Sequence, residues 1–356
     1  NSGVITSNDG AIDVVHGVPM KQAQRQLPET DDDDIMIGIL KERLQPHELQ
    51  LVDGTSLPPH QFMHLHHMKT GGTSVDDLLK CSVKRMQQVQ HYQAKHMSLH
   101  ECNGSHFKKC LEHTNELCQK SLDDTALLSY CAPLKYLTDF KWTSEEKANR
   151  PDFAAITVLR HPAERVWSNF RFATKGCYKC NELKNVYKAY EDNTLEAIGM
   201  RNESLCVRQM LNHQTFNLLS SKRFDKYKEG LVEVPEEDQE EMVKEAIDNM
   251  KNFFTMIGIT EELGTFGQMI PKVFPFMATT LEGSHRACHL PHSNKSPTNN
   301  KCIDNKEHWD LPSHPDKETQ NIIEKHNQMD IKLYEAAVKQ FQLQKKALGM
   351  DENDTA

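Results

Sequence analysis

The chain has 356 residues, of which 37% are hydrophobic and 26% are charged, and it carries a formal net charge of −9. A globular chain of this length holds one large α/β domain or two smaller ones. The negative balance argues against a general nucleic-acid-binding protein, because such proteins are usually basic.

The first part of the chain contains one strand-to-helix junction. Residues 1–57 lack sustained periodicity, and we interpret them as a stem with one short helix near Ile35–Leu44. Gln61–Met68 alternates in the manner of a strand, and Thr73–Cys81 predicts the start of a helix. The run Met86–Lys120 is rich in His, Gln, Lys and Cys without a clean period, so we expect an irregular insertion held by disulfides.

A second strand-to-helix junction lies in the middle of the chain. Ala154–Leu159 is a short apolar run typical of a buried strand, and Ala163–Ala173 predicts the helix that follows it. Two further helices are predicted over Asn185–Gly199 and Glu203–Leu219.

The last third alternates between helix and strand. A helix that begins at Pro235 has acidic residues in its first turn and an apolar stripe along one face. It is followed by a strand over Phe253–Ile259, a helix over Glu261–Phe274, a loop over 282–315 and a final helix over Asp316–Leu348.

This order of elements predicts a single α/β domain with a central parallel sheet flanked by helices. No internal repeat is visible in the sequence. We place the boundaries at 1–57 for the stem, 58–348 for the domain and 349–356 for a C-terminal tail.

The cysteine content points to an oxidising compartment. Ten cysteines is a high number for a cytosolic protein of this size, and the chain also contains Asn-X-Ser/Thr sequons. The sequons begin at Asn103, Asn202, Asn294 and Asn353. Together these features favour a luminal or secreted protein with most cysteines paired; the alternative is a set of buried free thiols.

The first junction carries the motif HLHHMKTGGTS, His64–Ser74. Glycines let a backbone approach an anion, the start of a helix points N–H groups at it, and a lysine adds full positive charge. The lysine precedes the glycines, so the order is the inverse of a Walker A loop. The alternative is an ordinary capped helix after a tight turn. The candidate anion-binding residues are Lys69, Thr70, Gly71, Gly72, Thr73 and Ser74.

The second junction carries TVLRHPAERVWSNFRF, Thr157–Phe172. Arg160 at the end of the strand and Ser168 two turns into the helix can converge on one dianion. A guanidinium meets two oxygens and a hydroxyl meets a third, which suits a monophosphate. The alternative is a surface helix with a salt-bridged arginine.

With these two motifs the sequence resembles the sulfotransferases that use 3′-phosphoadenosine-5′-phosphosulfate (PAPS). The likeness is greatest to the Golgi carbohydrate branch that includes heparan sulfate 2-O- and 6-O-sulfotransferases. It extends over most of residues 60–341, and its weaker parts are FFTMIGITEELGTF, PHSNKSP and HNQMDIKLYEAAVKQF. The resemblance implies a P-loop-like fold.

The resemblance also implies roles for single residues. Lys69 would contact the bridging oxygen and the sulfonate, and Thr70–Ser74 would hold the 5′-phosphate of PAPS. Arg160 and Ser168 would bind the 3′-phosphate, which remains in the product PAP. A loop containing Asn294, Lys295 and Ser296 would close over the nucleotide. No metal is implied.

The general base departs from the family pattern. In the relatives a histidine lies in the segment before the 3′-phosphate strand, whereas Leu127–Phe140 has none and places Tyr130 there. A neutral tyrosine is a poor base near pH 7. His67, beside the anion-binding turn, is our first candidate for the catalytic base. The other candidates are His96, His100, His113, Glu101 and Glu112.

Two other clusters receive a structural interpretation. His285, Cys288, His289 and His292 have spacings that could hold zinc, but the proline-containing context favours ordinary loop residues. Cys177 and Cys180 lack the strand-then-helix context of a redox dithiol, so we interpret them as structural.

We therefore expect a sulfotransferase that moves the sulfonate of PAPS to a hydroxyl of a glycan. The alternatives are an acceptor of another kind (protein tyrosine or a small alcohol), an inactive nucleotide-binding relative, and a kinase-like phosphotransferase. The expected location is the Golgi lumen, as a type II membrane protein whose anchor precedes this sequence. The sequence does not specify the oligomeric state.

Overall fold

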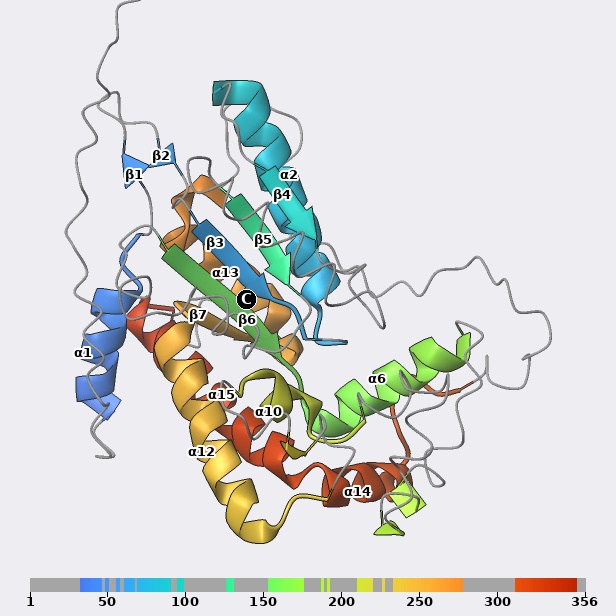
Figure 1. Cartoon of the computed structure of the whole chain (residues 1–356). Coiled ribbons are helices and arrows are strands. Elements are labelled where there is room, and N and C mark those ends of the chain that lie inside the picture. The colour runs from blue at the N-terminus through green and yellow to red at the C-terminus, as the bar shows by residue number, and fades with distance from the viewer. Residues whose placement is uncertain are drawn as a thin grey trace, which may run out of the picture.

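The computed structural model places a parallel sheet between layers of helices (Figure 1). Among the helices that it describes, none is at once long enough and apolar enough to span a membrane. It describes residues 33–46, 49–50, 56–57, 61–67, 69–90, 95–98, 126–130, 153–175, 187–188, 191–192, 210–219, 226–227, 233–277 and 311–350.

The main sheet has five strands in the order β4-β5-β3-β6-β7, and every neighbouring pair is parallel. The strand of this sheet that comes first along the chain, β3, lies at its centre. These findings confirm the predicted α/β class with a central parallel sheet. The bounds are β3 Gln61–Leu65, β4 Lys95–Ser98, β5 Ala126–Tyr130, β6 Phe153–Leu159 and β7 Met256–Ile259. A separate antiparallel pair joins β1 (Leu49–Gln50) to β2 (Ser56–Leu57).

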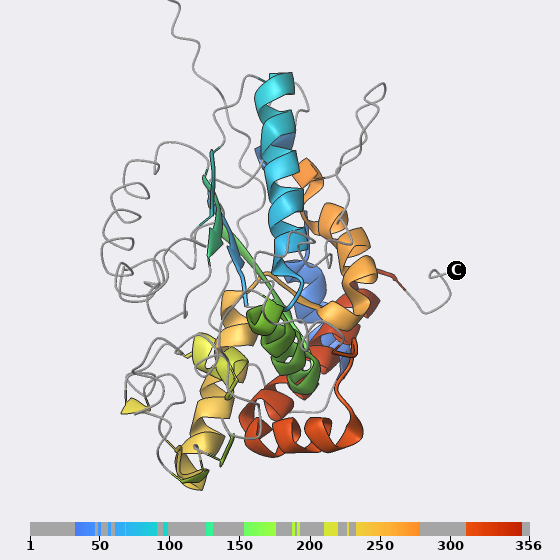
Figure 2. The same cartoon turned by 90° about the vertical axis from the view of Figure 1, so that its right-hand side faces the viewer.

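The period-2 alternation of the strands divides the core into two clusters. Met63 and Leu65 face the cluster that holds α10 (His213–Asn217), α12 (Glu236–Phe253) and part of α15 (Gln328–Ala347). Phe62, on the opposite face, packs with α2 (Gly72–Gln90) and α13 (Leu263–Val273). Figure 2 shows the sheet nearly edge on, with α2 and α13 on one side of it. Both faces are thus covered, as expected for a parallel sheet.

Helix α1 (Asp33–Arg43) packs against α15 at the side of the domain (Figure 1). Its Leu40 and the following Leu44 are buried in the cluster that contains α2 and α13. The guanidinium of Arg43 donates to the carbonyl oxygens of Lys251 and Asn252 at the end of α12. Part of the segment interpreted as a stem therefore contributes to the core.

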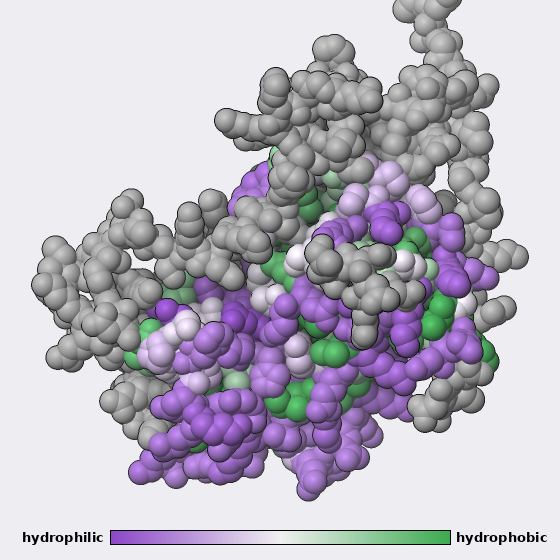
Figure 3. Space-filling view, turned by 180° about the vertical axis from the view of Figure 1, so that it is seen from behind, coloured by the Kyte–Doolittle hydropathy of each residue, from purple (hydrophilic) through white to green (hydrophobic). Residues whose placement is uncertain are grey.

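The edge strand β7 is covered by the side chain of Gln344 from α15. Its amide donates to the carbonyl of Ile257 over 2.8 Å and accepts from the N–H of Ile257 over 3.0 Å. At Ile257 this side chain therefore makes the bonds that a further strand would make. Seen from behind, the described surface is mostly hydrophilic, with hydrophobic patches between polar areas (Figure 3).

Most predicted elements agree with the structure within a few residues. The predictions at Ile35–Leu44, Gln61–Met68 and Ala163–Ala173 match α1, β3 and α6 (Pro162–Lys175). The predicted helix from Pro235 matches α12, whose Met242, Ala246 and Met250 are buried. The strand over Phe253–Ile259 is shorter than predicted, and the helix over Glu261–Phe274 begins as a 3₁₀ turn over Thr260–Glu262.

Three sequence predictions are wrong. The final helix is interrupted at Asn327, which separates α14 (Lys317–His326) from α15. The helix predicted over Glu203–Leu219 is limited, among its described residues, to α10, because Asn212 has a left-handed φ of 44°. The run Met86–Lys120 is not irregular throughout, since it contains the end of α2 and the whole of β4.

Several predictions lie wholly or largely outside the described residues, including the helix over Asn185–Gly199 and the loop over 282–315 up to residue 310. Cys81 is the only cysteine within the described ranges, and it is disulfide-bonded. Pairing of the other cysteines stays a prediction.

We expect Leu40→Ala to lower the free energy of unfolding by about 2–5 kcal/mol, because it leaves a cavity beneath α1. Leu40 is 1% exposed, whereas Ile35 on the same helix is 49% exposed. Ile35→Ala is the matched control and should cost about 0.5 kcal/mol or less. Urea unfolding of the two variants measures both values; equal losses would show that α1 does not contribute to the core.

Candidate functional site

The candidate site lies where the chain changes direction across the sheet. From β3 the chain crosses to β4 on one side, and from β6 it crosses to β7 on the other, while β3 and β6 are neighbours. Ligands of open α/β sheets bind at the carboxyl ends of strands at such a switch point. The turn after β3 leads into α2 and the turn after β6 leads into α6 (Figure 1). Both sequence motifs therefore meet at one end of the sheet.

The turn between β3 and α2 has an unusual backbone. Lys69 and Gly71 both adopt left-handed conformations, with φ of 66° and 82°. Left-handed residues in a turn direct neighbouring N–H groups into a concavity that suits an anion. A Cβ on Gly72 would lie 1.9 Å from Cδ2 of His66, so this position has no room for a side chain. The two glycines of the motif are thus required by the shape of the turn.

The buried carboxylate of Asp76 contacts two histidines that precede this turn. Asp76 on α2 places one oxygen 3.0 Å from Nδ1 of His64 and the other 3.3 Å from Nδ1 of His66. The two imidazole rings are stacked on each other. Since His64 belongs to β3 and His66 follows it, the contacts fix the first turns of α2 to the strand.

Two threonine hydroxyls connect the ends of the strands. The hydroxyl of Thr260 lies 2.8 Å from the carbonyl oxygen of Thr70 and 3.2 Å from that of Leu159. Thr157 donates to the carbonyl of Leu65 over 3.0 Å. Sequence reasoning did not single out Thr260 as a site residue, although it lies in the FFTMIGITEELGTF stretch.

Arg160 links the two motifs directly. Its Nη1 donates to the carbonyl oxygen of Lys69 over 3.2 Å, and its Nη2 donates to Glu164 over 3.2 Å. The backbone N–H of His161 donates to the carboxylate of Glu261 over 3.0 Å. One N–H group at the start of α6 is therefore bonded to a protein carboxylate, while the Arg160 side chain and the face of α6 can meet a bound anion.

The ammonium of Lys69 lies in a cationic and partly buried environment. Its Nζ is 4.3 Å from the centre of the Phe172 ring. Burial, together with the nearby guanidinium groups of Arg160 and Arg171, lowers the pKa of Lys69 to about 8. An anion placed among these three cations would relieve their mutual repulsion.

Ser168 is half-buried on α6. It lies one helical turn after Glu164, so the two residues share a face of the helix. Because Arg160 contacts Glu164, this face is the one that approaches the turn containing Lys69.

His67 is fully buried beside the turn. Burial lowers its pKa to about 3, assisted by the positive charge of Arg165 and by His66 and His64, so its imidazole is neutral at physiological pH. The amide nitrogen of Asn217 lies 3.3 Å from Nδ1 of His67. A base of such low pKa is poorly matched to an alcohol proton. A catalytic role for His67 stays a prediction that requires access to a buried ring.

A second buried cation lies beneath the site. Arg165 of α6 is fully buried, and its Nη2 is 3.9 Å from the carboxylate of Asp330 on α15. No hydrogen-bond partner faces its guanidinium nitrogens within the described part of the chain. Because an arginine side chain stays protonated, it contributes a permanent positive potential. Asp330 was not foreseen from the sequence.

Of the remaining residues that the sequence suggested for the site, the structure describes only some. Tyr130 ends β5 and pairs with Leu65 in the sheet, and His96 lies within β4. Residues outside the described ranges are the nucleotide-loop candidates Asn294, Lys295 and Ser296, the base candidates His100, Glu101, Glu112 and His113, and the His285–His292 run.

Comparisons with known proteins add no relative. The chain matches no protein-family model, and no curated protein matches it. Support for a function therefore comes from the motifs and from the geometry of the site.

We expect Lys69 to lose its proton near pH 8 in the free protein. The charged ammonium dominates below that pH, so affinity for an anion should fall as the pH rises through it. Competitive acylation with mass spectrometry measures the pKa, because only the neutral amine reacts. Arg171→Gln should raise this pKa by removing a nearby positive charge. A midpoint near the unperturbed value of about 10.4 in both proteins would contradict the described environment.

Proposed function

We propose that the protein is a sulfotransferase that moves the sulfonate of PAPS to a hydroxyl acceptor. The observation that carries the proposal is the contact between its two motifs. Arg160, from the 3′-phosphate-like motif, donates to the backbone of Lys69, from the 5′-phosphosulfate-like motif. The two motifs are far apart in the sequence, and each of them resembles a motif of the same family.

The chemistry of the residues fits a nucleotide with two separate phosphate groups. The turn from Lys69 to Ser74 offers backbone N–H groups, hydroxyls and an ammonium, which suits the 5′-phosphosulfate end. The guanidinium of Arg160 and the hydroxyl of Ser168 suit a 3′-phosphate. Glu164 already pairs with Arg160, so a phosphate must compete with this carboxylate for the guanidinium.

PAPS would supply an activated sulfonate, and the chain would supply position and charge. In an in-line transfer, negative charge builds on the oxygen that bridges the sulfur and the 5′-phosphorus. Lys69 would stabilise this charge, since its ammonium is the cation that the turn itself provides. With a pKa of about 8, Lys69 is mostly charged at neutral pH.

The parallel sheet and its strand–turn–helix junctions support a P-loop-like fold, and we include that fold in the proposal. A kinase-like phosphotransferase is the weaker candidate, because Lys69 precedes the glycines rather than following them as in a Walker A loop.

For the acceptor we propose a glycan hydroxyl in the Golgi lumen, with the protein held by an anchor that precedes this sequence. The disulfide at Cys81 is compatible with an oxidising compartment. Protein tyrosine and small alcohols are the competing acceptors, and an inactive relative would have none. A screen with radiolabelled PAPS against glycans, tyrosine peptides and small alcohols distinguishes these cases.

We expect Lys69→Ala to reduce sulfonate transfer by about 100-fold or more, because the lost charge acts mainly in the transition state. Lys80→Ala is the matched control, since Lys80 lies on α2 and its side chain is exposed. Turnover of labelled PAPS, with circular dichroism to verify folding, measures the effect. Turnover within about threefold of the wild type would refute the proposed role of Lys69.

The second motif predicts a preference for PAP over 5′-AMP, which lacks the 3′-phosphate. Charge-assisted hydrogen bonds contribute roughly 1.5–3 kcal/mol each, so 5′-AMP should bind about 10- to 1000-fold more weakly. Arg160→Ala should remove most of this preference and Ser168→Ala a smaller part. Calorimetry with both ligands on the three proteins measures it. Equal affinity of the wild type for both ligands would refute the assignment of the cofactor.

A further inference from the structure

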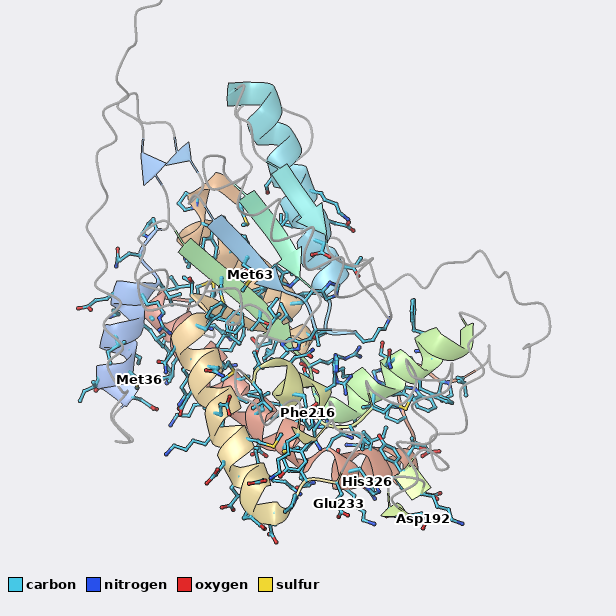
Figure 4. The ribbon with its side chains drawn as sticks, in the orientation of Figure 1. Met36, Met63, Asp192, Phe216, Glu233 and His326 are labelled. Carbon is cyan, nitrogen blue, oxygen red and sulfur yellow. The ribbon has the colours of Figure 1, made fainter. Side chains whose placement is uncertain are left out.

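Helix α10 is a five-residue element that lies between the sheet and the C-terminal helices (Figure 4). Its Phe216 packs in the same core cluster as Met63 of β3 and Met329 of α15. Gln214, Thr215 and Asn217 are buried as well, although they are polar. Buried polar side chains require hydrogen-bond partners, and those of α10 lead to both turns of the candidate site.

The start of α10 is fixed to the junction of α14 and α15. The N–H of Asn212 donates to the side chain of Asn327 over 2.7 Å, and the side-chain oxygen of Asn212 accepts from the N–H of Asp330 over 3.1 Å. The carboxylate of Asp330 accepts from the N–H groups of Gln214 and Thr215 and from the Thr215 hydroxyl. The left-handed backbone of Asn212 persists because these reciprocal bonds determine it.

From this fixed helix the side chain of Gln214 reaches the backbone of Arg160. Its amide nitrogen donates to the Arg160 carbonyl over 2.9 Å, and its amide oxygen accepts from the Arg160 N–H over 2.9 Å. Arg160 is the first residue after β6. The two bonds fix the position of the Arg160 backbone, from which the guanidinium extends toward Lys69.

The other end of α10 contacts the first turn. The amide nitrogen of Asn217 lies within hydrogen-bonding distance of His67, two residues before Lys69, and of His213. One short helix is therefore bonded to the turn after β3 and to the turn after β6.

We propose that Gln214 is a positioning residue for Arg160, held in place by Asp330. The recognition of a 3′-phosphate then depends on a buried amide that does not extend into the ligand site. This inference rests on the proposed function, because it assumes that Arg160 binds that phosphate. Loss of the two bonds lets the Arg160 backbone shift, and displacements of about 1 Å are enough to weaken a positioned contact strongly.

The chain offers a matched control. Gln344 makes the same pair of bonds, donor and acceptor, to the backbone of Ile257 on β7, and it is 1% exposed where Gln214 is 0% exposed. Gln344 bonds a residue within the edge strand β7 and not a residue of the turns that follow β3 and β6. A purely structural role for Gln214 would make the two glutamines equivalent.

The experiment measures the dissociation constants of PAP and 5′-AMP for the full chain and for its Gln214→Met and Gln344→Met variants, with the stability of each. We expect Gln214→Met to reduce the preference for PAP by about tenfold or more, while the affinity for 5′-AMP stays within about threefold. Gln344→Met should lower the stability and leave the preference unchanged.

A folded Gln214→Met variant that keeps the full preference for PAP would overturn the inference, as would an equal loss in the Gln344→Met variant. If Gln214→Met does not fold, Gln214→Asn provides the same comparison, since its amide is one methylene shorter and cannot keep both bonds. A wild-type protein without any preference for PAP contradicts the proposed function instead. The two failures are therefore distinguishable.

Discussion

The hydrogen bond from Arg160 to the backbone of Lys69 joins the two turns of the candidate site, and the rest of the site depends on it. It forms because β3 and β6 are parallel neighbours and point their carboxyl ends in the same direction. It also brings two cations together, and the pKa of Lys69 is lowered by its burial and then by the repulsion from Arg160. An arrangement that gathers several positive charges in one place is suited to an anion.

Carboxylates lie near the positive charges of the site at two depths. At the rim, Glu164 pairs with Arg160, and Glu261 accepts the N–H of His161 at the start of α6. Beneath the turns, Arg165 faces Asp330 at 3.9 Å, a separation at which attraction is present but a hydrogen bond is not. The carboxylate of Asp330 is already engaged by α10, so the buried guanidinium keeps much of its potential. That potential reaches His67 and His213, whose pKa values are lowered by burial and by Arg165.

The parts of this structure that could be predicted from sequence are those with local causes. The turn at Lys69, Gly71 and Gly72 could be predicted because the start of a helix and the glycines before it act within a few residues of one another. The apolar stripe of α12 follows from its own periodicity. The break at Asn327 and the left-handed Asn212 could not be predicted, because each is set by a partner more than a hundred residues away. Gln214 and Asp330 were missed for the same reason.

The different roles of two buried glutamines could not be predicted from the sequence. Gln214 and Gln344 are both buried in helices, and each bonds the backbone of one residue as donor and acceptor. Gln344 bonds the edge strand β7, whereas Gln214 reaches the candidate site. Only their tertiary partners distinguish them. The left-handed Lys69 has a related origin. A non-glycine residue in that conformation costs about 1–3 kcal/mol, and it persists because its surroundings determine it. Here the adjoining contacts come from Arg160, from Thr260 through Thr70, and from Asp76 through His66, so two distant segments and the helix that follows hold the backbone that would meet the ligand.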